Sequence, residues 1–314
     1  MKVLYPTSIE LDIESLVGFS VTLHPYNVKV TIPEELVDAE IMITWINSAE
    51  NLKDAARRMK NLRWIQALAA GPNDVLNAGF DSKIIITTGS GTHDNTVAEH
   101  TLGMILCGAR RFYEMRDYQL QSKWPGHLGG SFPRGGKFTT LRGARVLIWG
   151  FGGIAQTLTP LLSALGARVR GVARSSGVRS GIEVLSQDRL PELLAQTDVL
   201  VMILPGSEQT RKALNAERLK LLPEHAWVIN VGRGMSVDED ALVGSLEKGE
   251  IGGAALDVFE TEPLPASSLL WKAPNLIISP HAAGGRPEGC TDLIAENLRR
   301  FLAGRPLENA IKLS

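Results

Sequence analysis

The chain has 314 residues, of which 44% are hydrophobic and 21% are charged, as in ordinary globular proteins of one or two domains. Its 33 Lys and Arg against 34 Asp and Glu leave a net charge of −1, which offers no bulk attraction for nucleic acid or an anionic membrane. Two cysteines, Cys107 and Cys290, are too few for a disulfide framework and lack metal-ligand spacing. No apolar run approaches the ~18 residues of a membrane span. The first residues turn acidic before a signal-like stretch develops, so we expect a cytoplasmic two-domain protein without a metal site.

Short apolar runs alternate with a helical pattern in the first 95 residues. Within Ala49–Met59, the residues Leu52, Ala55 and Met59 recur at helical spacing on one face. This alternation predicts a small α/β domain. The runs that predict its strands are Val3–Tyr5, Val21–Leu23, Ile41–Thr44, Trp64–Leu68 and Ile84–Thr87.

A long helical pattern then runs from about Thr96 to Gln121. Asp94 or Asn95 is suited to cap its start, because a short side-chain oxygen can accept from the free N–H groups of the first turn. The following stretch, Trp124–Lys137, is rich in Gly and Pro and shows no periodicity, so it predicts a loop.

From Arg145 the pattern becomes more regular. Near-continuous apolar strands alternate with helical patterns, as a parallel sheet covered on both faces requires. The predicted strands are Arg145–Trp149, Arg168–Val172, Val199–Leu204, Trp227–Val231, Gly253–Val258 and Leu276–Ser279. The predicted helices are Ile154–Leu165, Leu190–Gln196, Thr210–Leu222 and Glu239–Lys248. Six strands in this alternation predict a Rossmann-type doubly wound fold that binds a dinucleotide.

A final helical pattern, Thr291–Ala303, follows a Gly-rich turn after the last strand. We expect this helix to return to the first domain, which makes that domain discontinuous. The predicted organisation is a smaller, flavodoxin-like α/β domain of residues 1–95 and 287–314, and a dinucleotide-binding domain of residues 96–286.

A glycine-rich turn directly follows the first strand of the second domain. Gly150 permits a tight turn, Gly152 lets the backbone approach a pyrophosphate, and Ala155 allows close helix–strand packing. The helix N-terminus adds free N–H groups and a favourable dipole. Because the motif lies between a strong strand and a strong helix, we interpret it as a phosphate-binding turn and not as a ligand-free turn. The residues expected to contact the cofactor here are Gly150, Phe151, Gly152, Gly153 and Ile154.

Three later strands end in ionisable residues. Arg233 follows one strand, Asp257 and Glu262 follow the next, and His281 follows the third. Ligands of doubly wound sheets bind outside the carboxyl ends of the strands. Each residue alone is compatible with a surface ion pair or an incidental histidine, but together, beside one cofactor turn, they predict an active site.

With these segments the chain resembles the D-isomer-specific 2-hydroxyacid dehydrogenases, which include glyoxylate/hydroxypyruvate reductases and phosphoglycerate dehydrogenases. The matching segments occur in the family's order between about residues 60 and 290. They are Asn95–His100, Gly150–Ala155, Leu204–Pro205 with Thr210, Asn230–Gly234, Leu256–Pro263 and Ser279–His281. The resemblance implies a substrate (lid) domain made of both chain ends and a central nucleotide domain. It also implies homodimers packed through the helix that carries Ala98–Leu106.

The resemblance also implies roles for the strand-end residues. His281 is the expected general acid when a 2-oxo acid is reduced and the base in reverse, which suits an imidazole because its unperturbed pKa is ~6.5. Glu262 is expected to hold His281 by a hydrogen bond, and Arg233 to pair with the substrate carboxylate and polarise its carbonyl. Asp257 is expected near the nicotinamide, whose hydride makes a metal unnecessary. Further expected cofactor contacts are Leu204, Pro205, Thr210, Val231, Gly232 and His281.

The substrate loops of the first domain are less typical of the family. Ala70 and Gly71 can donate backbone N–H groups to a substrate carboxylate, but Pro72 cannot, and Asn73 stands where the family has Asp. On pattern alone this stretch is also an ordinary Gly-Pro turn. Trp45 occupies the loop in which phosphoglycerate dehydrogenases supply an arginine to a phosphate, which counts against phosphoglycerate. Trp45 is therefore either a substrate contact or a packing residue.

The cofactor preference follows from the end of the second strand. An NAD site places an acidic residue about 20 positions after the turn, on the ribose 2′-OH. No acidic residue lies between Gly150 and Gly181, and Arg174 and Ser175 end the strand, with Arg179 in the following loop. These residues favour NADP(H), because a 2′-phosphate can pair with Arg174. The alternative is that Arg174 stacks on the adenine and NAD(H) binds.

The sequence thus predicts an NAD(P)-dependent enzyme that reduces a small 2-oxo acid, such as glyoxylate or hydroxypyruvate, to the D-2-hydroxy acid. The alternative is a nucleotide-sensing, corepressor-like interaction protein on the same fold. The intact set of Arg233, Glu262 and His281 favours the enzyme. Expected partners are the small acid and a second copy of the chain, without nucleic acid or membrane.

Overall fold

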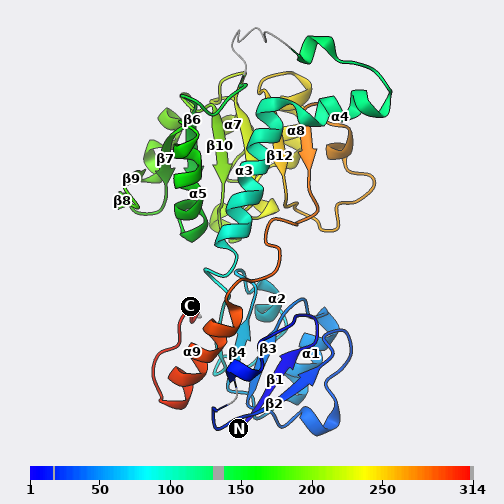
Figure 1. Cartoon of the computed structure of the whole chain (residues 1–314), viewed down its shortest axis with the longest axis vertical. Helices are drawn as coiled ribbons and strands as arrows, with labels where there is room; N and C mark the ends of the chain where they lie inside the picture. Colours follow the sequence, from blue (N-terminus) through cyan, green and yellow to red (C-terminus); the bar gives the residue numbers. More distant parts are fainter. Residues whose placement is uncertain (17, 130–137, 312–314) are drawn as a thin grey trace. The chain divides into compact units, whose positions relative to one another are not determined.

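The computed structural model describes residues 1–16, 18–129 and 138–311. The chain divides into two compact units (Figure 1): unit 1 comprises Met1–His93 with Arg286–Ser314, and unit 2 comprises Asp94–Gly285. The boundaries expected from the sequence lay one to two residues further along the chain at each crossing. The assignment of the units to substrate and cofactor remains a prediction.

Unit 1 is built on a five-stranded parallel sheet in the order β2-β1-β3-β4-β5. This is the flavodoxin-like order. The strands are β1 (Lys2–Pro6), β2 (Thr22–Tyr26), β3 (Ile41–Thr44), β4 (Trp64–Ala67) and β5 (Ile85–Thr87). The helices are α1 (Ala49–Arg58), α2 (Asn73–Leu76) and α9 (Cys290–Leu302). The predicted α/β class is confirmed for this unit.

Both faces of this sheet are covered. Ala55 of α1 and Met59, the residue after this helix, pack on one face. Helix α1 begins at Ala49 because the side chain of Ser48 accepts a hydrogen bond from the backbone N–H of Asn51. Ile294 and Leu298 of α9 are completely buried on the other face. The C-terminal helix therefore closes the core of the N-terminal sheet.

Unit 2 contains a larger sheet in the order β13-β12-β11-β10-β6-β7-β9-β8, in which only β8 is antiparallel to its neighbour within the described residues. Its strands are β6 (Arg145–Trp149), β7 (Arg168–Val172), β8 (Gly177–Arg179), β9 (Ile182–Leu185), β10 (Val199–Met202), β11 (Trp227–Asn230), β12 (Gly253–Leu256) and β13 (Leu276–Ile278). Its helices are α3 (Asp94–Arg110), α4 (Phe112–Leu120), α5 (Gly153–Ala164), α6 (Leu190–Leu194), α7 (Ala216–Leu219) and α8 (Glu239–Glu247).

The strand order reverses at β6, which lies between β7 and β10. Helices α3 and α5 cover one face, through side chains such as Ala98, Ile105 and Leu158, and α6, α7 and α8 cover the other. In a doubly wound sheet the ligand crevice lies at this switch point, outside the carboxyl ends of the strands. The predicted Rossmann-type architecture is thereby confirmed, and the glycine-rich turn lies at the switch point.

The expected single helix from Thr96 to Gln121 was wrong. The chain forms α3 and α4 instead, separated by Arg111 in the left-handed region at φ 55°. One left-handed residue ends a right-handed helix, and no Gly or Pro marks this position in the sequence. The expected cap residues Asp94 and Asn95 lie inside α3. Of the expected loop, residues 126–128 form a short 3-10 turn and residues 130–137 lie outside the described part of the chain.

One further prediction in unit 2 was wrong, and one feature was not predicted. Thr210–Leu222 is not one helix, because Leu214 forms a bridge with Val237 and Asn215 caps the short helix α7. The hairpin of β8 and β9 was not predicted, since its two strands are only three and four residues long. It extends the sheet beside β7.

Candidate active site

The glycine-rich turn leads from β6 into α5. Gly150 has φ 99°, and a Cβ there would overlap the Ile203 carbonyl, so this position requires glycine. Gly152 is the N-cap of α5, and a Cβ on it would meet nothing within 4 Å. A Cβ on Gly153 would overlap the Asp94 carboxylate. The turn thus offers an exposed helix N-terminus with space for close approach, which fits a pyrophosphate.

Arg179 connects this turn to the loop after β7. Its Nη1 donates to the Phe151 carbonyl at 2.8 Å, and its Nη2 donates to the backbone oxygen and Oγ of Ser175, both at 2.9 Å. Arg174 and Ser175 are exposed beside it. The unpredicted hairpin therefore places a second arginine at the end of β7, next to Arg174.

The loops after β10 and β11 pack together. A Cβ on Gly232 would lie 2.7 Å from the backbone N and O of Leu204, so glycine allows this approach. Thr210 Oγ1 donates to the Pro205 carbonyl at 2.7 Å and folds that loop back on itself. Val231 is buried, and its N–H donates to Met202 at 3.1 Å. These expected cofactor residues therefore shape one edge of the sheet.

The Arg233 backbone is held at its carbonyl and at the following residue, Gly234. Its carbonyl accepts from Ser236 Oγ at 2.7 Å and from Asn230 Nδ2 at 3.2 Å. Gly234 lies directly against the backbone of Phe259, which a Cβ would overlap. The segment that carries Arg233 is thus packed on the segment that leads to Glu262.

His281 and Glu262 form a close pair. His281 Nδ1 lies 2.6 Å from Glu262 Oε2, and Glu262 Oε1 accepts from the Phe259 N–H at 2.9 Å. The His281 side chain is 50% exposed, and its backbone is left-handed at φ 53°. The structure therefore brings together the two residues that the sequence analysis paired, with the imidazole open to a ligand.

Asp257 is 1% exposed, and its carboxylate faces the turn after His281. Oδ1 accepts from Ala282 N at 2.8 Å and from Ser279 Oγ at 2.5 Å, and Oδ2 accepts from Ala283 N at 3.0 Å. His100 Nε2 lies 3.0 Å from the same Ser279 Oγ. Sequence reasoning expected Asp257 near the nicotinamide and did not single out Ser279 for a role.

Glu239 was also missed. It begins α8, and its Oε1 accepts from the Glu260 N–H at 2.7 Å, which fixes the loop that carries Glu262. Burial raises the pKa of Glu239, and the carboxylates of Glu260, Asp240 and Glu262 act in the same direction. In the sequence Glu239 is only an acidic first-turn residue after the Asp238 cap, so no motif signals it.

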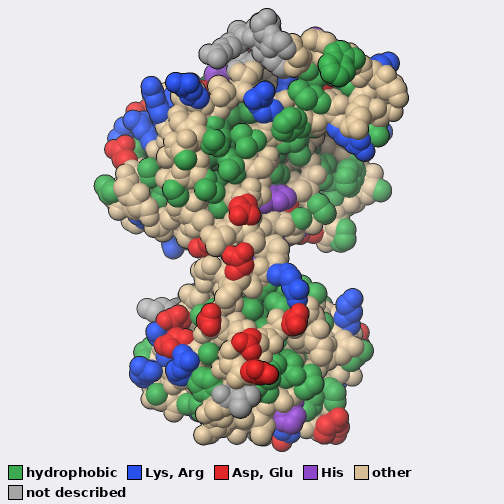
Figure 2. Space-filling view, in the orientation of Figure 1, with side chains coloured by type: hydrophobic (Ala, Val, Ile, Leu, Met, Phe, Trp, Pro, Cys, Tyr) green, Lys and Arg blue, Asp and Glu red, His purple; other side chains and the backbone are tan. Residues whose placement is uncertain are grey.

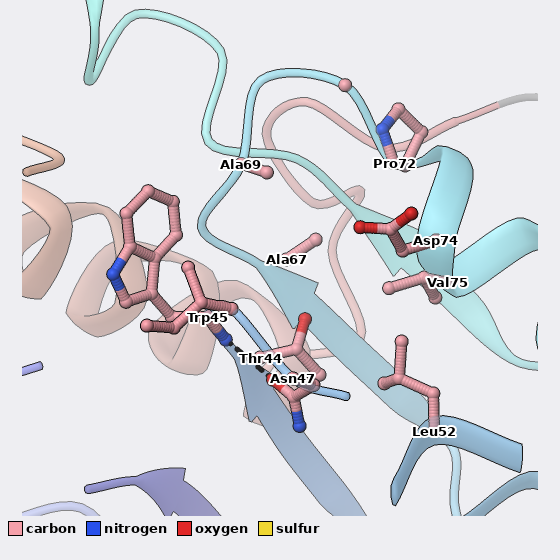
Figure 3. A pocket seen from close by; sticks show the side chains of 11 residues that line it. Thr44, Trp45, Asn47, Leu52, Ala67, Ala69, Pro72, Asp74 and Val75 are labelled. Carbon is pink, nitrogen blue, oxygen red and sulfur yellow. Dashed lines mark hydrogen bonds between the residues drawn. The ribbon is translucent and has the colours of Figure 1, made fainter. Parts of the chain in front are cut away.

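Unit 1 has its own pocket at the carboxyl ends of β3 and β4 (Figure 3). The Asp74 carboxylate and the ring of Trp45 lie on opposite sides of it, with Ala67 between them. Ala70, expected beside Gly71 as a donor, is exposed next to it. The residues lining the pocket are Thr44, Trp45, Ile46, Asn47, Leu52, Ala67, Ala69, Gly71, Pro72, Asp74 and Val75.

The Trp45 loop is fixed by polar contacts. Asn47 Oδ1 accepts from Trp45 N at 2.9 Å, and Asn47 Nδ2 donates to Tyr26 Oη at 2.8 Å. The Trp45 ring stacks on His93 with centroids 5.6 Å apart. Ile46 is 63% exposed and left-handed at φ 49°, an unusual conformation for a β-branched residue. A residue keeps such a conformation only when the surrounding contacts hold its backbone in place.

Two features are absent from the described residues. No group of three or more His, Cys, Asp and Glu side chains in that part of the chain could hold a metal ion. None of its helices is long and apolar enough to cross a membrane. On the face shown in Figure 2, each unit carries both basic and acidic side chains, in keeping with the net charge of −1.

A protein-family model, curated proteins and solved structures match this chain. Residues 102–283 match the family model described as D-isomer specific 2-hydroxyacid dehydrogenase, NAD binding domain. Glyoxylate/hydroxypyruvate reductase A from Salmonella newport is 30% identical over 288 residues, covering 87% of this chain and 86% of that protein. A crystal structure of a D-isomer specific 2-hydroxyacid dehydrogenase family protein from Aeromonas salmonicida matches with TM-score 0.85 and 28% identity over 99% and 98% of the two chains. An NADPH-dependent glyoxylate/hydroxypyruvate reductase from Sinorhizobium meliloti, in complex with NADP and sulfate, matches with TM-score 0.81 and 25% identity over 99% and 98%.

Proposed function

The chain belongs to the D-isomer-specific 2-hydroxyacid dehydrogenase family, an NAD(P)-dependent class of enzyme, and we propose that it reduces small 2-oxo acids of the glyoxylate or hydroxypyruvate type with NADPH. The observation that carries the proposal is the 2.6 Å pair of His281 and Glu262, on the same sheet as Arg233 and the glycine-rich turn. The names of the Salmonella and Sinorhizobium proteins support the same substrate class and NADPH.

His281 is the proposed general acid. Because Nδ1 is engaged by Glu262, Nε2 is the ring nitrogen that donates a proton to the carbonyl oxygen as it becomes a hydroxyl. Glu262 itself is oriented by the Phe259 N–H, so the imidazole is held in one ring orientation. In the reverse reaction the same Nε2 accepts the hydroxyl proton.

Arg233 is the proposed carboxylate-binding residue. Its guanidinium has a planar fork of donors that matches a carboxylate, and it can also polarise the neighbouring carbonyl. Hydrogen bonds from Asn230 and Ser236 hold the Arg233 carbonyl, so little backbone entropy is lost when this residue binds substrate. Bound NADPH supplies the hydride.

The NADP(H) preference rests on the end of β7. Arg174 and Ser175 are exposed there, Arg179 is held beside them, and no carboxylate intervenes between Gly150 and Gly181. A 2′-phosphate would therefore meet the cations of Arg174 and Arg179 and the Ser175 hydroxyl. NAD(H) lacks the group that these side chains would bind.

The unit 1 pocket is the proposed site of substrate selection, with Trp45, Ala70 and Gly71 as contacts. The small side chains of Ala67 and Ala69 leave room in it for a short 2-oxo acid, which would bind on the Trp45 side, away from the Asp74 carboxylate (Figure 3). We also propose a homodimer packed through α3, in keeping with the family resemblance. Sedimentation equilibrium at micromolar concentration should then give twice the 34.0 kDa chain mass.

The decisive experiment is turnover of NADPH with a panel of 2-oxo acids, followed by absorbance, with the product's configuration determined by chiral chromatography. We expect glyoxylate or hydroxypyruvate to give the highest kcat/KM and any chiral product to be the D-isomer. The proposal would be contradicted if, with every acid in the panel, wild-type protein oxidised NADPH no faster than the His281→Ala variant.

A further inference from the structure

We propose that His100 is a positioning residue for His281, acting across unit 2 through Ser279 and Asp257. The inference rests on the proposed role of His281 as proton donor. The segment Asn95–His100 contributed to the family resemblance, but neither the sequence nor the proposed mechanism gives His100 a task.

The first step is the turn at His281. This residue is left-handed at φ 53°, a backbone conformation that a non-glycine residue keeps only when its surroundings hold it. Three consecutive N–H groups end on Asp257: that of His281 donates to the Asp257 carbonyl at 2.8 Å, and those of Ala282 and Ala283 donate to its carboxylate. Asp257 therefore fixes the direction in which the His281 side chain leaves the chain.

The second step is the orientation of the Asp257 carboxylate. The Asp257 carboxylate is 1% exposed, so its oxygens need hydrogen-bond donors, and besides the two backbone N–H groups its donor is the Ser279 hydroxyl at 2.5 Å. A hydroxyl has one proton and can point it to only one acceptor. Loss of this donor would leave Oδ1 with a single N–H and let the carboxylate rotate.

The third step brings in His100. Because Ser279 Oγ donates to Asp257, it must accept from His100 Nε2 at 3.0 Å, and this requires a proton on Nε2. The same nitrogen lies 3.4 Å from Asp257 Oδ1. His100 thus fixes the rotation of the hydroxyl and adds a donor beside the carboxylate. It lies on α3, which Ala98 and Ile105 anchor in the core, so this support is rigid.

The test compares His100→Leu, which removes the donor, with His100→Gln, whose amide can still donate. His225 supplies a matched control: it is 26% exposed against 28% for His100, and its Nε2 lies 2.8 Å from Asp198 Oδ1 at the amino edge of the same sheet. For each full-length variant, kcat, both KM values and the melting temperature are measured. Amide hydrogen exchange at Ala282 and Ala283 is followed by NMR.

For His100→Leu we expect kcat to fall about tenfold, as for loss of one hydrogen bond, with the KM for NADPH within about twofold of wild type. Exchange at Ala282 and Ala283 should accelerate. His100→Gln should restore most of both properties, and His225→Leu should change neither kcat nor these exchange rates.

Unchanged kcat and exchange in His100→Leu, or equal losses in the Leu and Gln variants, would overturn the proposal. A fall in kcat that merely follows melting temperature, and that His225→Leu reproduces, would also overturn it. A wild-type protein without reductase activity would instead overturn the proposed function. The exchange rates of Ala282 and Ala283 would then still decide whether His100 holds the turn.

Discussion

The carboxyl edges of the two parallel sheets differ in what they present. In unit 2 the strand ends carry Arg233, Glu262 and His281, and hydrogen bonds fix the backbone or the side chain of each. In unit 1 the strand ends carry Trp45 and Ile46 beside a pocket that Ala67, Ala69 and Asp74 also line, and Asn47 Oδ1 accepts from Trp45 N. The unit 2 edge presents several ionisable groups, whereas the unit 1 pocket is lined mainly by uncharged side chains, with Asp74 as its charged group.

In the proposed mechanism, unit 2 carries the groups that react and unit 1 the pocket that selects among substrates. Proton transfer and carboxylate binding need charged groups held at fixed positions, and these do not depend on the substrate's side chain. Selection among small acids depends on pocket walls, and a change in one wall residue alters the fit of one substrate more than another. Substitutions in unit 2 should therefore change kcat for every substrate, and those in unit 1 should change the ranking of substrates.

The largest effect is expected for His281→Ala. General acid–base catalysis contributes about 10²–10⁴-fold, so kcat should fall by that factor. Because the glycine-rich turn is untouched, the Kd for NADPH, measured by fluorescence titration, should stay within about twofold of wild type. Near-normal turnover would show that His281 is not the proton donor.

Arg233→Lys should cost less, about a hundredfold in kcat/KM, because a point charge replaces a bidentate fork. The loss should appear with every 2-oxo acid in steady-state assays. Arg211→Lys provides a matched control, since Arg211 pairs with Glu208 in an exposed loop of the same unit. Equal activities of the two variants would show that Arg233 does not bind the carboxylate.

Arg174→Asp should shift the ratio of kcat/KM for NADPH over NADH by about 10- to 150-fold towards NADH. The physical reason is loss of a pairing charge and gain of a repelling one beside the 2′-phosphate. Most of the shift should lie in the KM for NADPH. Wild-type activity with NADH as high as with NADPH would contradict this preference.

Trp45→Ala tests the other edge. We expect the KM values for individual 2-oxo acids to change by up to roughly tenfold and in different proportions, with kcat for the best substrate nearly unchanged. Because Trp45 also stacks on His93, the melting temperature is measured alongside. A uniform loss with all substrates, matched by lower stability, would make Trp45 a packing residue.

The smallest effect concerns the amino edge of the unit 2 sheet, where Asp198 has no proposed catalytic task. Burial raises the pKa of Asp198, but hydrogen bonds from Arg145 and His225 outweigh it and lower the pKa to about 2. A carboxyl group whose folded pKa is depressed stabilises the protein above its unfolded pKa, and this stability is lost as pH falls towards the folded value. The free energy of unfolding of wild type should therefore fall between about pH 4 and 2, by about 1–2 kcal/mol more than that of Asp198→Asn. Identical pH profiles in urea titrations would contradict this.

Much of the candidate site could be predicted from the sequence because its parts are local. The glycine-rich turn is contiguous. Arg233 and His281 lie three residues and Glu262 six residues after the end of an apolar strand, so parallel strand order places all three beyond one edge of the sheet. The fold class followed for the same reason, from strands and helices whose periodicity lies within short windows.

Contacts between distant segments could not be predicted in this way. The break at Arg111 carries no Gly or Pro signal. The shortening of the helix expected at Thr210–Leu222 to α7 and the added β8–β9 hairpin also lack local signals, because the bridge of Leu214 to Val237 and the pairing of β9 with β7 form only in the folded sheet. Short strands carry too few residues to show a period.

The sequence by itself therefore determined the main strands, the glycine-rich turn and the set of ionisable residues beyond the strand ends. The tertiary structure decided which side chains hold them: Glu239 on the loop before Glu262, Arg179 beside Ser175, and His100 on Ser279. His100 and Ser279 are 179 residues apart in the chain. Hydrogen bonds depend on separations of about 3 Å and on direction. Sequence spacing specifies neither for residues on different elements, and packing of the helices on the sheet specifies both.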